Sequence, residues 1–260
     1  MYVYGSAGEK TSPLWCEAFA QGSGGRVTYK CELKAGDVAV WGSPRLSNLI
    51  KQAQAEGRTW YYGDKAYFGR GVYYRCTRNA YMQTHLGHAT PHRWEQLGLK
   101  IKPWQSGKRI LVCPQSEAHF KHHGQDRDKW LKSVLAQLKQ HTDRKVVVRD
   151  KSGTNAEQDF EQQLADVHAV VVFTSIAGVQ ATMHGVPCFA THQCAASLVG
   201  DNDLANIEQP RRPDNREQLA WWLADNQWTL DEIRRGMAWQ KLSNGGESGS
   251  QQMSSISLTG

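Results

Sequence analysis

Short apolar runs alternate with amphipathic segments along most of the chain. In the first 65 residues, three runs have the length and the aromatic or β-branched content of strands. They span residues 1–6, 37–43 and 59–64. Residues 44–57 predict a helix, because Pro44 suits a first helical turn and Gly57 suits a C-terminal cap. Residues 65–85 follow neither the period of a strand nor that of a helix, and they predict an irregular segment.

A second series of alternating segments begins near residue 108. The predicted strands span residues 108–116, 145–151, 168–175 and 186–192. The predicted helices span residues 126–142, 157–166 and 176–185. The Val-rich runs at 146–148 and 170–173 are typical of parallel strands buried on both faces. Residues 210–242 are helical in pattern.

This alternation predicts an α/β fold built from two series of βα units. Residues 103–109 read as the linker between the two series. We therefore expect an N-terminal lobe over residues 1–104 and a C-terminal lobe over residues 105–242. Residues 243–260 are rich in Gly, Ser and Gln and predict a disordered tail.

Composition narrows the class of protein. An apolar fraction of 40% and a charged fraction of 22% are ordinary for a globular chain. No run reaches the roughly 18 apolar residues that a membrane span needs, and the N-terminus lacks a basic segment followed by an apolar one. The six cysteines form no CxxC pair. We expect a cytoplasmic protein with reduced thiols and no membrane partner.

The positive charge is concentrated in the N-terminal part. Residues 1–103 hold 14 Lys and Arg against 7 Asp and Glu, whereas the remainder holds 17 against 18. In residues 58–102 the cations interleave with aromatic residues, a composition that suits binding to DNA. The alternative is a packed segment whose tyrosines fill the core and whose arginines are solvated. The candidate DNA-binding residues are Arg58, Lys65, Arg70, Arg75, Arg78 and Arg93.

Polar groups follow three of the strands in the second series. Thr174 and Ser175 offer hydroxyl groups and a helix N-cap, and Gly178 allows close approach of the backbone. A helix that starts in this way favours a phosphate, although an ordinary capped turn has the same sequence. The other two strands end in groups that could bind a pyrophosphate, or that could serve as salt-bridge partners. These groups are Gln115, Ser116, Arg149 and Lys151.

The unit FTSIAGVQATMHGVPCFAT at residues 173–191 resembles the nucleotide-sugar site of GT-B glycosyltransferases. In that superfamily a Ser/Thr–x–x–Gly helix start faces the diphosphate, and a Gly-x-Pro strand follows, here at residues 185–187. The resemblance covers roughly residues 105–242. It implies two Rossmann-like lobes with a cleft between them and the donor on the C-terminal lobe. Gln180 stands where the superfamily commonly has an acidic ribose ligand, so it is assigned to the ribose.

The resemblance also implies a nucleoside diphosphate sugar as donor, with UDP-glucose as the first choice, and no required metal or other cofactor. The residues assigned to the donor are Gly5, Ser6, Gln115, Ser116, Arg149, Lys151, Thr174, Ser175, Gly178, Val179 and Gln180. The spacing of His119, His122 and His123 does not fit a zinc site, and Asp201 and Asp203 suit a solvated loop. No metal site is predicted.

A glycosyl transfer needs a base for the acceptor hydroxyl. Asp64 ends a predicted strand of the N-terminal lobe and is the candidate base, with a turn-forming Asp as the alternative. The sequence therefore predicts a glycosyltransferase, and the N-terminal charge favours a 5-hydroxymethylated base in double-stranded DNA as acceptor. This resembles the phage enzymes that glucosylate such bases. The alternatives are a transferase acting on a surface polysaccharide or a small molecule, and a non-catalytic nucleotide- or nucleic-acid-binding module.

Overall fold

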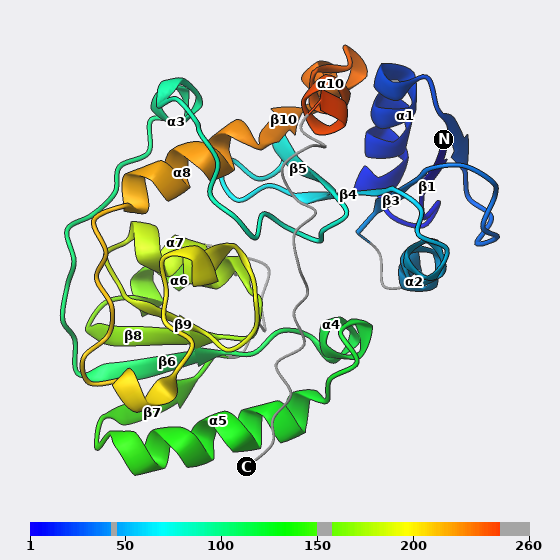
Figure 1. Ribbon diagram of the computed structural model, residues 1–260. Helices are drawn as coiled ribbons and strands as arrows, with labels where there is room; N and C mark the ends of the chain where they lie inside the picture. Colours follow the sequence, from blue (N-terminus) through cyan, green and yellow to red (C-terminus); the bar gives the residue numbers. More distant parts are fainter. Residues whose placement is uncertain (43–45, 150–157, 245–260) are drawn as a thin grey trace.

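The computed structural model describes residues 1–42, 46–149 and 158–244, which form two sheets surrounded by helices (Figure 1). The first sheet has the strand order β10-β5-β4-β3-β1-β2, and the second has the order β7-β6-β8-β9. The strands of the first sheet are β1 (Tyr2–Tyr4), β2 (Arg26–Thr28), β3 (Val38–Trp41), β4 (Trp60–Lys65), β5 (Tyr73–Arg78) and β10 (Gln227–Thr229). Those of the second are β6 (Arg109–Cys113), β7 (Lys145–Val148), β8 (Val167–Val172) and β9 (Cys188–Ala190).

The two sheets share one topology. In each, four parallel strands lie in the order second, first, third and fourth along the chain, which is β2-β1-β3-β4 in one sheet and β7-β6-β8-β9 in the other. This order is a common doubly wound one. The predicted α/β fold with two Rossmann-like lobes is therefore confirmed. We call the first sheet with its helices the first lobe, and the second sheet with its helices the second lobe.

Helices pack around both sheets. The first lobe carries α1 (Thr11–Ser23), α2 (Ser47–Ala55), α9 (Leu230–Arg234) and α10 (Met237–Asn244). The other helices are α3 (His92–Gln96), α4 (Glu117–His122), α5 (Arg127–His141), α6 (Gln158–Gln163), α7 (Ile176–Met183) and α8 (Arg216–Asp225). Gly57, the predicted C-cap of α2, has φ +66°, which a glycine adopts without strain. Pro44 lies outside the described residues.

The second sheet shows why its strands read as continuous apolar runs. Val171 and its neighbours at alternate positions pack against α5, whereas Val170 and Val172 pack on the opposite side with α7. Because successive side chains of a strand point to opposite faces, both faces must be apolar when both are covered. Figure 1 shows α5 and α7 on opposite sides of this sheet.

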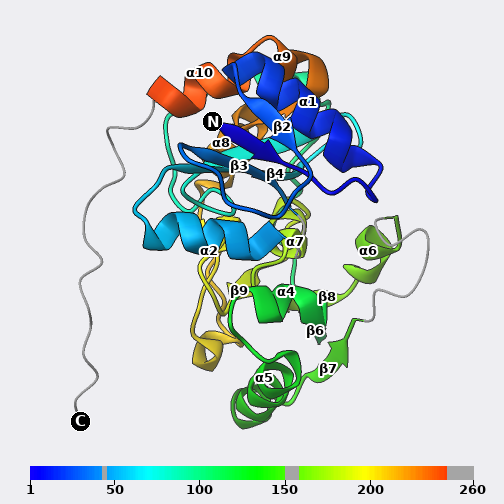
Figure 2. The same cartoon turned by 90° about the vertical axis from the view of Figure 1, so that its right-hand side faces the viewer.

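The first lobe departs from the prediction in several elements. Helix α1 and strand β2 lie in a region for which the sequence predicted no element, and β5 lies inside the segment predicted as irregular. Strand β5 runs antiparallel to β4, and β10 runs antiparallel to β5. Residues 227–242 were assigned to the C-terminal lobe, whereas Trp228, Ile233 and Ala238 complete the apolar core of the first lobe. Figure 2 shows α9 and α10 beside α1, far along the chain from them.

A shared core joins the lobes. Tyr67, Phe68 and Trp94 of the first lobe belong to the same buried cluster as Val170 and Ala195 of the second. The tyrosines of the basic segment thus fill the interior, as the alternative interpretation of that segment expected. The predicted cleft between the lobes stays a prediction. Within the described residues, no helix is both long and apolar enough to cross a membrane. Of the predicted tail, Ser243 and Asn244 belong to α10, and the rest lies outside the described residues.

Candidate functional site

The second sheet has a polar junction where its strand order reverses. In this topology the loops after the first and third strands diverge and leave a ligand crevice at the carboxyl ends of those strands. Gln115 follows β6 and Thr174 follows β8. The Gln115 Oε1 atom accepts hydrogen bonds from the Thr174 backbone N–H (2.9 Å) and from the Thr174 hydroxyl (3.1 Å). Two of the predicted donor residues are therefore joined across the reversal point.

His119 completes this junction. Its Nε2 atom lies 2.7 Å from Thr174 Oγ1. The Thr174 hydroxyl hydrogen is directed to Gln115, so we assign the His119 proton to Nε2, from which it is donated to Thr174. Ser116, the residue after Gln115, caps α4 by accepting a hydrogen bond from the His119 backbone N–H. His119 is thus held by α4 at the end of the sheet, a role that its position in the sequence did not reveal.

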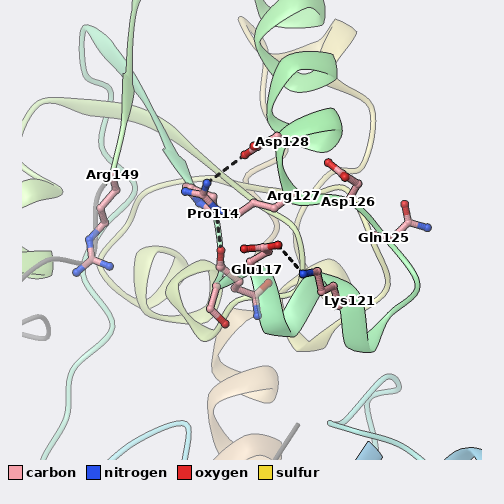
Figure 3. A pocket seen from close by; sticks show the side chains of 10 residues that line it. Pro114, Glu117, Lys121, Gln125, Asp126, Arg127, Asp128 and Arg149 are labelled. Atoms are coloured by element: carbon pink, nitrogen blue, oxygen red, sulfur yellow. Dashed lines mark hydrogen bonds and ion pairs between the residues drawn. The ribbon is translucent and has the colours of Figure 1, made fainter.

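A pocket of about 440 Å³ lies beside this junction (Figure 3). It is lined by the loop after β6, by α4, by the start of α5 and by the residue after β7. The lining residues are Pro114, Gln115, Ser116, Glu117, Lys121, Gln125, Asp126, Arg127, Asp128 and Arg149. Three of the predicted donor residues, Gln115, Ser116 and Arg149, thus line one pocket.

The cations of the pocket differ in how they are held. Lys121 pairs with Glu117 at 2.6 Å, and both side chains are exposed. Arg127 donates from Nε to the Gln115 carbonyl (3.2 Å) and pairs with Asp128 at 3.3 Å. Exposed pairs of this kind contribute little to stability. The sequence analysis missed Arg127, which lies at the start of α5 and not at a strand end.

Arg149 is the most firmly held cation of the pocket. Its backbone N–H donates to the Val112 carbonyl (2.8 Å), its guanidinium lies over the Phe160 ring at 4.8 Å, and its Nε donates to Gln163 (3.1 Å). Only 7% of the residue is exposed. Figure 3 shows this side chain on one side of the pocket, across from Lys121. A fixed, planar guanidinium suits recognition of a phosphate. Lys151, its predicted partner, lies outside the described residues.

The turn into α7 is more closed than the sequence suggested. Ser175 caps α7 by accepting from the Ala177 N–H (3.2 Å), and Thr174 and Ser175 are both buried. A Cβ atom on Gly178 would lie 2.7 Å from the Ala196 Cβ and from the Cys188 Sγ, so this glycine allows α7 to pack on the core. Close packing of α7 thus requires a glycine at this position, and the phosphate role of Gly178 stays a prediction.

The remaining predicted donor residues are dispersed. The Val179 side chain is buried in the shared core, and Gln180 is half-buried further along α7. Gly5 and Ser6 lie at the end of β1 in the first sheet. A Cβ atom on Gly5 would lie 2.9 Å from Cys16 Sγ, so packing of α1 explains this glycine as well.

Asp64 lies near the carboxyl end of β4, as predicted, and it forms an ion pair. Its Oδ2 atom is 2.6 Å from Arg75 Nη2, and the side chains are 28% and 4% exposed respectively. Burial acts most strongly and lowers the pKa of Arg75, but the Asp64 carboxylate and, after it, Tyr67, Tyr62 and Cys76 together raise the pKa above its usual value. The Tyr62 ring contacts the Tyr81 ring (5.1 Å). Two residues along the same strand face the same way, so Asp64 shares this face with Tyr62.

The face that carries Asp64 meets the second lobe. The Tyr81 ring lies 4.5 Å from the His122 ring and 5.6 Å from the His123 ring, both at the end of α4. Burial, and then Lys51, lowers the pKa of His122. Burial, and then His122 and His192, lowers the pKa of His123 to about 4. These rings form a neutral contact between the lobes, and the described residues contain no group of side chains suited to a metal ion.

Most of the six candidate DNA-binding residues contact the chain itself. Arg58 donates to backbone carbonyls of the loop before β3. Arg93 forms two hydrogen bonds with Glu232 (2.7 and 3.0 Å). Arg78 donates to the Leu242 carbonyl in α10 (3.3 Å). Arg75 pairs with Asp64. Lys65 is exposed, and Arg70 is half-buried. Arg58, Arg75, Arg78 and Arg93 therefore contact groups of the chain itself, and the DNA interface stays a prediction.

We compared the chain with known proteins and describe two solved structures to which it is similar. No protein family and no curated protein matches the sequence. The chain is similar to Thermosulfurimonas dismutans KpsC, beta Kdo 2,4 transferase, at 16% identity and a TM-score of 0.49, over 85% of this chain and 90% of that one. It is also similar to Thermosulfurimonas dismutans KpsC, beta Kdo 2,7 transferase, at 14% identity and a TM-score of 0.48, over 92% and 99%. A TM-score below 0.5 carries no conclusion about function.

Proposed function

We propose that this protein is a glycosyltransferase that moves a sugar from a nucleoside diphosphate donor to a hydroxyl acceptor. The observation that carries the proposal is the polar pocket at the carboxyl end of the second parallel sheet. Gln115 and Arg149 line it, and Gln115 joins it to Thr174 at the point where the strand order reverses. Ligands of doubly wound sheets bind at such a point.

The chemistry of the pocket suits a departing diphosphate. When the bond between the sugar and the diphosphate breaks, the electron pair leaves with the phosphate oxygen, and negative charge develops there. The Arg149 and Arg127 guanidinium groups provide fixed positive charge for this oxygen, and the His119–Thr174 junction lies beside them. Preorganised donors of this kind account for much of the rate in group transfer. No metal is needed for this step.

Asp64 supplies the base in this proposal. Its carboxylate takes the proton of the acceptor hydroxyl as the acceptor oxygen bonds to the anomeric carbon of the sugar. Support comes from its place near the carboxyl end of β4, on the face that reaches the second lobe through Tyr62 and Tyr81. Donor and base would then lie on different lobes, as the GT-B resemblance implies.

The acceptor we propose is a carbohydrate or a small hydroxyl compound. The DNA acceptor depended on a row of arginines available to phosphates, and Arg58, Arg78 and Arg93 are engaged within the first lobe. A 5-hydroxymethylated base in DNA is therefore the second choice.

One observation favours a different class of protein. Because the Asp64 carboxylate is paired with Arg75, the pair also suits a scaffold that binds a nucleotide without chemistry. Asp64→Asn separates the two classes. A transferase loses turnover and keeps nucleotide binding, whereas a binding module shows no turnover in the parent protein.

The experiment is a thermal-shift and calorimetric screen of UDP-glucose, UDP-galactose, GDP-mannose and nucleotide-activated Kdo, with UDP and inorganic phosphate as controls. A ligand at 100 times its Kd stabilises the fold by about 2.7 kcal/mol. We expect stabilisation by a nucleotide sugar and by its free nucleotide, but not by phosphate alone. Release of the nucleotide is then measured with carbohydrate acceptors and with hydroxymethylated DNA, in the presence and absence of EDTA. Absence of binding by every nucleotide tested would overturn the proposal.

A further inference from the structure

We propose that Arg75 is a positioning residue that holds the Asp64 carboxylate in one orientation for the acceptor hydroxyl. This inference rests on the proposed function, since it concerns the proposed base. Arg75 was selected from the sequence as a DNA contact, a role that its burial does not suit, because only 3% of the residue is exposed.

Both oxygens of the Asp64 carboxylate have a partner. Oδ2 accepts from Arg75 Nη2 at 2.6 Å, and Oδ1 accepts from the Lys65 backbone N–H at 2.7 Å. Two such bonds fix the plane of the carboxylate, and the 28% exposure of the side chain leaves part of it open to a substrate. Gly42 lies beside this carboxylate. A Cβ atom at that position would lie 3.1 Å from Asp64 Cγ, so a glycine there avoids crowding the carboxylate.

Arg75 is itself held in place. Its guanidinium lies 5.3 Å from the centre of the Tyr67 ring, and the Tyr67 hydroxyl donates to Gln83 Oε1 at 2.6 Å. Tyr67 belongs to the core that joins the lobes. The orientation of Asp64 is therefore tied, through Arg75 and Tyr67, to the same packing that sets the lobes against each other.

The Arg75 guanidinium is hydrogen-bonded to Asp64 through its Nη2 atom. Its Nε and Nη1 atoms are buried and have no hydrogen-bond partner among the described residues, so Asp64 is the carboxylate that compensates this guanidinium. A buried charge that loses its one partner is costly, so the buried guanidinium of Arg75 keeps the Asp64 carboxylate beside it. The competing explanation is that the ion pair only stabilises the sheet. Asp64 and Arg75 are direct cross-strand neighbours, and such opposite-charge pairs stabilise sheets.

The test compares Arg75→Met, Arg75→Lys and Asp64→Asn, alone and with Arg75→Met added to Asp64→Asn. The control is Lys241→Met, which also removes a cation from a carboxylate (Asp225, 2.6 Å) and from an aromatic ring (Trp222, 5.4 Å). Nucleotide release from UDP-glucose, or from the donor that binds in its place, is measured well below each melting temperature. Donor affinity is measured by calorimetry in parallel.

We expect Arg75→Met to lower kcat about 100-fold with donor affinity changed less than about threefold, because misplacing a reacting group by about 1 Å costs that much. Arg75→Lys restores part of the loss. In the Asp64→Asn background, Arg75→Met has no further effect on kcat, because Arg75 acts through Asp64. Lys241→Met lowers the melting temperature and leaves kcat unchanged.

Three outcomes separate the proposals. If Asp64→Asn is inactive but Arg75→Met behaves like Lys241→Met, the base stands and the role of Arg75 is wrong. If Asp64→Asn is fully active, the base is wrong, and Arg75 loses its role with it, while donor binding still tests the pocket. If Arg75→Met does not fold, Arg75→Lys decides: full kcat in that variant overturns the proposal, since a lysine lacks the planar fork that sets the carboxylate.

Discussion

The parallel strands of the two sheets have the same order, but different groups meet at the carboxyl ends of these strands. At the reversal point of the first sheet, the Trp41 indole N–H donates to Glu9 Oε2 at 3.1 Å, and Asp64 is joined to the buried Arg75 nearby. At the reversal point of the second sheet, Gln115 joins Thr174 beside an open pocket. One topology thus carries a paired carboxylate at one carboxyl end and a polar pocket at the other.

The two lobes also use their cations differently. In the first lobe, Arg58 and Arg93 bind carbonyls and a carboxylate of the same chain, and a DNA interface there stays a prediction. In the second lobe, where the net charge is close to zero, Arg127 and Arg149 line a pocket. A count of charges along a sequence therefore says less about partners than the place of each charge relative to a strand end.

The largest expected effect concerns the ligand pocket. Arg149→Met leaves an apolar side chain beside Phe160 and removes the guanidinium together with its contact to the ring. Hydrogen bonds to charged groups contribute about 1.5–3 kcal/mol, so nucleotide affinity should fall about 10- to 100-fold. Calorimetry with the nucleotide found in the screen measures this affinity. The control is Lys132→Met, an exposed change on α5 outside the pocket. Equal affinity in both variants would remove Arg149 from the site.

A smaller effect separates packing from binding at the start of α7. Gly178→Ala places a Cβ atom 2.7 Å from Ala196 and Cys188, and we expect a loss of about 1–3 kcal/mol in the free energy of unfolding. Gly8→Ala in the first lobe has open space and should change stability by less than about 0.5 kcal/mol. Urea unfolding measures both. Weaker nucleotide binding by folded Gly178→Ala, without a loss of stability, would restore the phosphate role predicted for this glycine.

The strands of the two lobes show where the sequence predicted the structure and where it did not. The second lobe was predicted almost element by element, because strands such as β8 are buried on both faces and their apolar runs are unbroken. Strands β5 and β10 were missed, since both are short and rich in polar residues and they pair with each other across a long stretch of chain. A period of two is hard to recognise when, as in β5, buried Arg75 and Thr77 occupy core positions.

The same reasoning applies to the site. Polar residues after β6, β7 and β8 were found because parallel strands bring their carboxyl ends together, and this needs only the order of the elements. The partner of Asp64 could not be found in this way, because Arg75 reaches it through an antiparallel pairing that the sequence did not predict. His119 was considered as part of a metal tract or of a loop beside the donor, since nothing in the sequence shows that α4 directs it to Thr174.

A third prediction concerns DNA. Six phosphate contacts would give a slope of about −5 when the logarithm of the binding constant is plotted against the logarithm of salt concentration. Because most of the candidate arginines are engaged within the first lobe, we expect a slope shallower than about −2 with duplex DNA. Fluorescence anisotropy over a salt series measures it. A steep slope that Arg58→Met and Arg78→Met both reduce would bring back the DNA interface.

A fourth prediction concerns a pH dependence at the contact between the lobes. The pKa of His123 is about 4 in the folded chain, lowered by burial and then by His122 and His192, and about 6.5 in an unfolded one. As the pH falls through this window, the unfolded chain binds a proton that the folded chain does not, so stability decreases with falling pH. His123→Phe keeps a ring against Tyr81 and Phe173 but cannot titrate. Melting temperatures measured from about pH 7 to about pH 4 should therefore fall less in the variant than in the parent, and carboxylates that titrate in both proteins cancel in the difference. Identical slopes would show that protonation of His123 does not bear on how the lobes meet.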